Sequence, residues 1–158
     1  MNDLTARKRW MATLAKAPLQ ELEALVGQLE PLPDYRFLRS PETGLTMVRG
    51  RAGGVGEVFN LGEMTLTRCV VQLSSEPMAS VMASEETITG FGYVGGRSHR
   101  HAELAALCDG LLQHSDWQAR VQSAVLEPLT VMAQRRREQQ QQQTAATKVD
   151  FFTMLRGQ

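Results

Sequence analysis

The sequence predicts an α+β fold, with N-terminal helices, a central and mainly antiparallel sheet, C-terminal helices and an extended docking tail. Residues 3 to about 30, and again those after Ser98, place apolar side chains at the three-and-four spacing of amphipathic helices. Residues 34 to 97 instead contain alternating and β-branched runs separated by glycine-rich turns. Helices that are segregated from strands argue against a regular βαβ alternation.

The N-terminal region predicts two helices. The first carries apolar residues at helical spacing, namely Trp10, Met11, Leu14 and Ala15. Pro18 suits the first turn of the second helix, where a missing N–H costs nothing. A stripe along that helix, which we interpret as core, consists of Leu19, Leu22, Val26 and Leu29.

The middle region predicts strands joined by turns. Tyr35 and Phe37 share one face of a first strand, SPETGL (residues 40–45) predicts a tight turn, and LTMVRGR returns. The segment MTLTRCVVQL, residues 64–73, is rich in Thr and Val and predicts the central strand. In TITGFGYVGGR, Phe91 and Tyr93 share a face of the last strand.

The C-terminal region predicts further helices. Ser98 is placed to cap one helix and Ser115 the next, and Pro128 breaks or restarts the chain beyond it. The apolar face of the first of these helices consists of Leu104, Leu107, Cys108, Leu111 and Leu112. After Arg137 the pattern dissolves into glutamines, which predict a linker or a frayed helix end. We therefore expect a single domain over residues 1–137, a Gln-rich linker over 138–148 and an apolar docking segment over 149–158.

The composition of the chain excludes several classes of protein. The chain of 158 residues has 17 basic and 17 acidic residues, and such a balance argues against a nucleic-acid surface. The short cluster Arg135, Arg136 and Arg137 is interpreted as a solvated helix face. Cys69 and Cys108 lie in apolar stretches and are expected to be reduced core residues. No segment has the length of a signal peptide core or of a membrane span, so a soluble, cytoplasmic protein is expected.

Two stretches are candidate anion sites. In GRAGGVGE, residues 50–57, Gly53, Gly54 and Gly56 free the backbone to point N–H groups at an anion beside Arg51. The spacing matches neither a Walker loop nor a dinucleotide fingerprint, and a glycine-rich hairpin is the alternative interpretation.

In GGRSHRHAE, residues 95–103, Arg97 and His101 lie at an expected helix N-terminus, which favours bound phosphate. A zinc site of His99, His101 and Glu103 is an alternative, but residues two apart on a helix point in nearly opposite directions. We expect no metal, and no nucleophilic catalytic set stands out.

The C-terminal segment KVDFFTMLRGQ is apolar where a tail should be polar. Aromatic residues and methionine are favoured at the centres of protein interfaces. The segment predicts docking onto another subunit, with folding back onto its own domain as the alternative, through Phe151, Phe152, Met154 and Leu155.

Several of these stretches together resemble the PhnG family of the bacterial carbon–phosphorus lyase core complex. They are AGGVGEVFNLGEMTLTRCVVQL, GYVGGRSHRHAELAALCDGLLQ and VDFFTMLRG, with RKRWMATLA and PETGLTMVRGRAGG also fitting. The resemblance runs from about residue 7 to residue 157 and departs at the glutamine tract.

The resemblance implies a subunit that works with PhnH, PhnI and PhnJ partners, in two copies each. Together they would convert ATP and an alkylphosphonate such as methylphosphonate into ribose 1-methylphosphonate 5-triphosphate and adenine. It implies that MgATP is a substrate of the complex, that this chain alone binds no cofactor, and that catalysis resides mainly in the PhnI partner. A stand-alone adaptor that docks through its tail is an alternative, and a small metal-dependent hydrolase is another.

Overall fold

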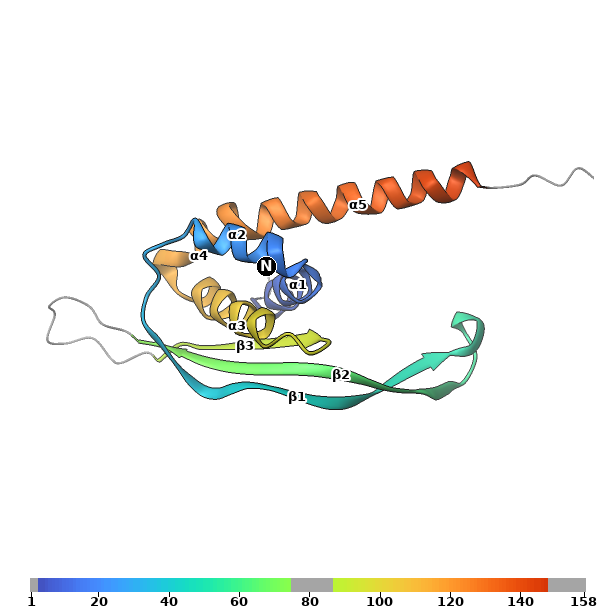
Figure 1. Cartoon of the computed structure of the whole chain (residues 1–158), viewed down its shortest axis with the longest axis horizontal. Coiled ribbons are helices and arrows are strands. Elements are labelled where there is room, and N and C mark those ends of the chain that lie inside the picture. The colour runs from blue at the N-terminus through green and yellow to red at the C-terminus, as the bar shows by residue number, and fades with distance from the viewer. Residues whose placement is uncertain (1–2, 75–86, 148–158) are drawn as a thin grey trace, which may run out of the picture.

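The computed structural model describes residues 3–74 and 87–147 and confirms the α+β class. Figure 1 shows three strands on one side of the molecule and helices stacked over one face of them. In chain order the elements are α1 (Asp3–Lys16), α2 (Leu19–Gly27), β1 (Tyr35–Arg51), β2 (Val58–Leu73), β3 (Thr89–Gly95), α3 (His99–Gln113), α4 (Ser115–Val121) and α5 (Glu127–Ala146). A 3₁₀ turn at Ala52–Gly54 joins β1 to β2, and a π-helical turn at Gln122–Leu126 joins α4 to α5.

The sheet is antiparallel in the order β1-β2-β3, so the segment predicted as the central strand does lie at its centre. Strand β1 pairs with β2 from Tyr35, opposite Leu73, to Arg51, opposite Val58. Strand β3 pairs only with the part of β2 between Leu66 and Gln72. The outer half of the β1–β2 hairpin therefore extends beyond β3 as a two-stranded ribbon, which Figure 1 shows on the side toward which α5 also projects.

The tight turn predicted at residues 40–45 is wrong, because β1 continues through this segment. The register with β2 shifts between Phe37 and Arg39 and again between Arg39 and Glu42, so two irregularities absorb the sequence that resembled a turn. Pro41 is tolerated there because β1 is an edge strand of this sheet and needs no N–H on its open side. The chain reverses instead at residues 52–57.

Helix α3 forms the centre of the core and packs directly on β3. Gly90 and Gly92 face the helix, and a Cβ atom at either position would collide with the carbonyl oxygen of Ala106 or Ala102. The two glycines therefore set the short distance between helix and strand. All five residues of the predicted apolar face are buried: Leu104, Leu107, Cys108, Leu111 and Leu112.

The remaining helices cover α3 from the side opposite the sheet (Figure 1). Trp10 and Leu14 of α1 and Leu22 of α2 are buried, as the apolar spacing predicted. Val125 and Leu129 extend the same core into the turns before and within α5. Pro128 lies in the first turn of α5, directly after the π-helical turn, and the backbone stays helical at Leu126 and Glu127, so the chain does not break there as predicted.

One of the two predicted helix caps is confirmed. The Ser98 hydroxyl accepts a hydrogen bond from the His101 N–H at 3.3 Å and caps α3. Ser115 is the first residue of α4, and its cap is His114, whose Nδ1 accepts from the Asp116 N–H at 3.2 Å. The cap prediction failed by one residue because a neutral imidazole nitrogen accepts this hydrogen bond as a hydroxyl would.

Helix α5 continues to Ala146 and includes the glutamines that the sequence assigned to a linker. Glutamine, arginine, glutamate and alanine all favour helix, and no glycine or proline interrupts the run. Residues 134–147 are exposed, so this part of α5 projects as a polar rod. The predicted docking segment 149–158 lies outside the described residues.

Candidate functional site

The most elaborate polar cluster is buried and centres on Asp109 of α3. Its carboxylate is fully buried and accepts from Arg7 Nε at 3.1 Å, Arg7 Nη2 at 2.7 Å and Trp10 Nε1 at 2.8 Å. It also accepts from the Phe91 backbone N–H at 2.9 Å and from Gln113 Nε2 at 3.3 Å. The donors come from α1, β3 and α3 and engage both oxygens, so Asp109 ties three elements together.

The glycine-rich loop forms the end of the long hairpin. Gly53 and Gly54 have φ values of 57° and 80°, which favour glycine. The Gly56 N–H donates to the Ala52 carbonyl oxygen at 2.9 Å, and Arg51 Nη1 donates to the Gly56 carbonyl oxygen at 3.1 Å. Arg51, which was expected to face an anion, therefore closes its own turn. This geometry agrees with the alternative interpretation of the loop as a glycine-rich hairpin.

The second predicted anion site lies where β3 leads into α3. Arg97 is exposed beside the cap Ser98, at the N-terminus of α3. His101 is only 7% exposed, and its Nε2 lies 2.8 Å from the Leu14 carbonyl oxygen. His101 therefore links α3 to α1, whereas Arg97 is exposed at the N-terminal end of α3.

The structure does not bring the two predicted anion sites together within one chain. Val58 is the partner of Arg51 at one end of the hairpin, whereas the Gly96 N–H donates to the Thr65 carbonyl oxygen. The seven residue steps along the strand from Val58 to Thr65 correspond to about 23 Å. Arg51 and Arg97 therefore cannot hold the same small anion within one chain.

The side chains of the zinc alternative diverge. His99 Nε2 lies 3.2 Å from the Thr43 hydroxyl, and His101 points at α1. Glu103 accepts from the Tyr35 hydroxyl at 2.6 Å and pairs with Arg100 at 3.1 Å. Within residues 3–74 and 87–147, no group of three His, Cys, Asp or Glu side chains is arranged to hold a metal ion.

The thiols and the tyrosine of the core are poorly suited to nucleophilic chemistry. Both cysteines are free and buried, as predicted. Burial raises the pKa of Cys69 to about 11 and that of Cys108 to about 12. Burial, the hydrogen bond to Glu103 and its charge raise the pKa of Tyr35 to about 12. All three groups are therefore neutral at physiological pH, whereas a nucleophilic thiol acts as its thiolate.

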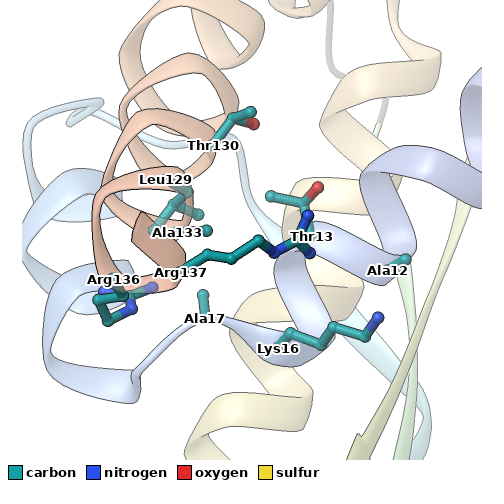
Figure 2. A pocket seen from close by; sticks show the side chains of 9 residues that line it. All are labelled: Ala12, Thr13, Lys16, Ala17, Leu129, Thr130, Ala133, Arg136 and Arg137. Carbon is teal, nitrogen blue, oxygen red and sulfur yellow. The ribbon is translucent and has the colours of Figure 1, made fainter. Parts of the chain in front are cut away.

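A basic cleft between α1 and α5 was not recognised in the sequence. Its lining includes Lys16 of α1 and Arg136 and Arg137 of α5, and Figure 2 shows Arg137 extending toward Thr13 while the Lys16 side chain points away from both arginines. Arg136 donates to both carboxylate oxygens of Glu21 at 2.7 Å. The cleft suits an acidic group, but its cations are long exposed side chains. No local pattern indicates this cleft, because Lys16 and Arg137 are brought to it only by the tertiary structure.

Seven of the twelve large apolar side chains that are exposed among the described residues lie on the outer half of the hairpin, residues 43–66, which we call the distal arm. Leu61 is 62% exposed, Leu45 is 67% exposed and Val55 at the tip is 93% exposed. The other large apolar side chains exposed on the arm are Met47, Val58, Phe59 and Met64. Isolated exposed apolar residues need no explanation, but a cluster of this kind marks an interaction surface.

No helix among the described residues is both long enough and apolar enough to cross a bilayer. The described residues form an α+β protein with a helical body and a projecting arm of exposed apolar side chains. A cluster of this kind is typical of a protein that assembles with others.

Comparison with known proteins identifies the family. The model of the family described as "Phosphonate metabolism protein PhnG" matches residues 5–157. A Rhizobium meliloti (strain 1021) protein named alpha-D-ribose 1-methylphosphonate 5-triphosphate synthase subunit PhnG is 38% identical over 152 residues, which are 96% of this chain and 90% of that protein. The chain belongs to the PhnG family, and the resemblance stated from its motifs is confirmed.

Proposed function

We propose that this chain is a non-autonomous subunit of an α-D-ribose 1-methylphosphonate 5-triphosphate synthase. The complex would join ATP, as MgATP, and an alkylphosphonate, with release of adenine, during phosphonate catabolism. The observation that carries the proposal is the match to a synthase subunit over 96% of the chain. Displacing adenine requires a phosphonate oxygen held in line with the ribose carbon and charge stabilisation around the triphosphate.

The described residues support a division of labour between subunits. The buried carboxylate of Asp109 is fully engaged, the thiols are protonated, and the histidines of α3 contact their own chain. We therefore place the catalytic residues mainly in a PhnI-type partner. We also propose PhnH- and PhnJ-type partners, with two copies of each subunit and a cytoplasmic location.

Of the candidate anion contacts, Arg97 is best placed to reach a substrate at a subunit boundary. It is exposed at a helix N-terminus, where unpaired N–H groups favour phosphate. The loop of Arg51, Gly53, Gly54 and Gly56 is at the other end of the hairpin and serves a different neighbour in this proposal.

The C-terminal segment is proposed to dock onto a neighbouring subunit through Phe151, Phe152, Met154 and Leu155. It follows α5, whose last turns project away from the core (Figure 1). Deleting residues 149–158 should weaken assembly while leaving thermal unfolding of the chain unchanged, because the helical core precedes the deletion. A truncated chain that assembles normally would refute this role.

The test of the subunit assignment is co-expression with the three proposed partners, with a tag on the N-terminus of this chain only. Affinity capture followed by mass determination should recover one complex with two copies of each subunit. Recovery of this chain alone, as a stable monomer, would contradict the proposal and favour a stand-alone adaptor.

A further inference from the structure

The distal arm has apolar side chains on both of its faces. Register partners in an antiparallel pair share a face, and side chains alternate along each strand. Thr67 is buried toward the helices and pairs with Thr43, so Leu45 and Met47 lie on the same inner face further out. Met64 pairs with Thr46 on the outer face. Beyond the register shift, Leu61 lies against Gly50, the partner of Phe59, so both apolar side chains extend the outer face.

Within residues 3–74 and 87–147, the ribbon is contacted only at its base, where His99 lies against Thr43 and β3 and Gly96 meet Leu66 and Thr65, and its apolar side chains further out are exposed. Strand β3 ends opposite Leu66, and α3 follows β3 back over the body of the sheet (Figure 1). The arm then extends a further eight residues of strand to Val58, or about 26 Å. A ribbon of two strands without a third layer is marginal in water.

The inner half of the same hairpin shows how this chain protects an open edge. There the β1–β2 pairing has two of its three register shifts, and Arg39 and Arg68 bracket Glu42 at 2.8 and 2.6 Å. Irregularities and charges of this kind block pairing with other chains. In the arm the pairing from Thr43 to Val48 is regular, and the third shift follows only between Val48 and Arg49. The stretch Thr43–Val48 is therefore the part of this edge that lacks such protection.

We propose that the distal arm is the segment by which this chain is held in the synthase, and that an apolar groove in a different subunit receives it. This inference rests on the proposed function. The groove encloses both faces of the ribbon. One wall is apolar and faces Phe59, Leu61 and Met64. The other covers Leu45 and Met47 and offers polar partners to Arg49 and Glu63.

Neither a second copy nor a lipid surface accounts for the arm as well. Two arms packed symmetrically would cover one face of each ribbon and leave the other exposed. Insertion into a bilayer would bury Arg49 and Glu63, which lie midway along the arm, in a medium that offers no partners. The arm has two arginines, Arg49 and Arg51, and two glutamates, Glu57 and Glu63, so no net charge attracts it to acidic lipid.

The experiment is co-expression of the N-terminally tagged full chain with the other synthase subunits, comparing the wild type with Leu61→Glu and Leu4→Glu. The two leucines are similarly exposed, at 62% and 71%, but Leu4 is on α1. A charge in the apolar groove should lower the partner recovered per tagged chain by about tenfold or more. Leu4→Glu should recover as much as the wild type, and both variants should unfold at the wild-type temperature.

Each other outcome has a distinct meaning. Equal recovery by Leu61→Glu and the wild type would overturn the role of the arm and leave the subunit assignment standing. No recovery by the wild type would overturn both. A wild-type dimer in the absence of partners that Leu61→Glu converts to monomer would identify a second copy as the occupant. Flotation of the wild type, but not the variant, with phosphatidylglycerol vesicles would identify lipid. Either result would contradict the proposal.

Discussion

The two halves of the β1–β2 hairpin are built from similar residues but lie in different surroundings. In the inner half, Cys69, Val71 and Leu73 are at most 5% exposed because α3 and its neighbours cover them. In the distal arm, Leu45 and Leu61 are more than half exposed on the same continuous strands. Alternating apolar residues therefore specify a strand. Whether its apolar side chains are buried within this chain or stay exposed for contact with another protein depends on whether a layer of helices covers the strand.

The largest effect on stability should come from the core that covers the inner half, at Asp109 of α3. Replacing Asp109 with Asn removes the charge that pairs with Arg7 and leaves an amide group among five donors. Breaking a buried pair costs about 3–5 kcal/mol, so urea unfolding should show a loss of that size.

The matched control is Glu42→Gln, because Glu42 pairs with two arginines at the exposed surface. Exposed ion pairs contribute about 0–1 kcal/mol, and the variant should unfold close to the wild type. A loss at Asp109 no larger than that at Glu42 would contradict its role as the link between α1, β3 and α3.

The next comparison sets a core leucine against a leucine of the arm. Leu111 is fully buried and Leu61 is 62% exposed. Truncating Leu111 to Ala should cost about 2–5 kcal/mol in the free energy of unfolding. Leu61→Ala should stay within about 0.5 kcal/mol of the wild type. Equal losses in chemical denaturation would mean that the arm packs against the chain's own body.

A smaller effect is expected from adding one methyl group to each region. Gly92→Ala places a Cβ against the Ala102 backbone, which can move only if α3 moves, and should cost about 1–3 kcal/mol. Gly44→Ala, in the arm, meets no atom within 4 Å and should change stability by less than about 0.5 kcal/mol. Thermal unfolding of both variants checks the pair, and a neutral Gly92→Ala would contradict the close packing of α3 on β3.

The smallest effect on the chain itself should come from Arg97→Ala, since this side chain is exposed at the start of α3. If Arg97 contacts the anionic substrate at a subunit boundary, the variant should assemble normally and raise the apparent KM of the complex. Steady-state kinetics of the captured complex provide the measurement. Unchanged kinetics in an intact complex would remove Arg97 from the substrate site.

Local patterns predicted much of this molecule. The α+β class, the central strand and the buried face of α3 follow from spacing that spans a few residues, and the structure confirms them. The predicted turn at residues 40–45 failed because Ser, Pro and Gly also suit the irregularities of an edge strand. The motifs distributed along the chain were sufficient to indicate the family that the comparisons established.

Features that depend on distant residues escaped prediction. Asp109 binds Arg7 from 102 residues away, and Lys16 and Arg137 line one cleft only because two helices pack. His101 was predicted as an anion contact, but α1 covers it and supplies the Leu14 carbonyl. The exposure of the arm was also missed. Alternating apolar residues look the same in a covered strand and in an uncovered one, so they do not show whether helices or another strand pack against the arm.

The most direct test of the contrast between the two halves is amide hydrogen exchange of the free chain and of the same chain in the captured complex. Exchange within residues 43–66 should slow strongly on assembly, because a groove covers both faces of the ribbon. Exchange in β3 and α3, which are already protected by the core, should change little. Arm amides that exchange as fast in the complex as in the free chain would contradict the account.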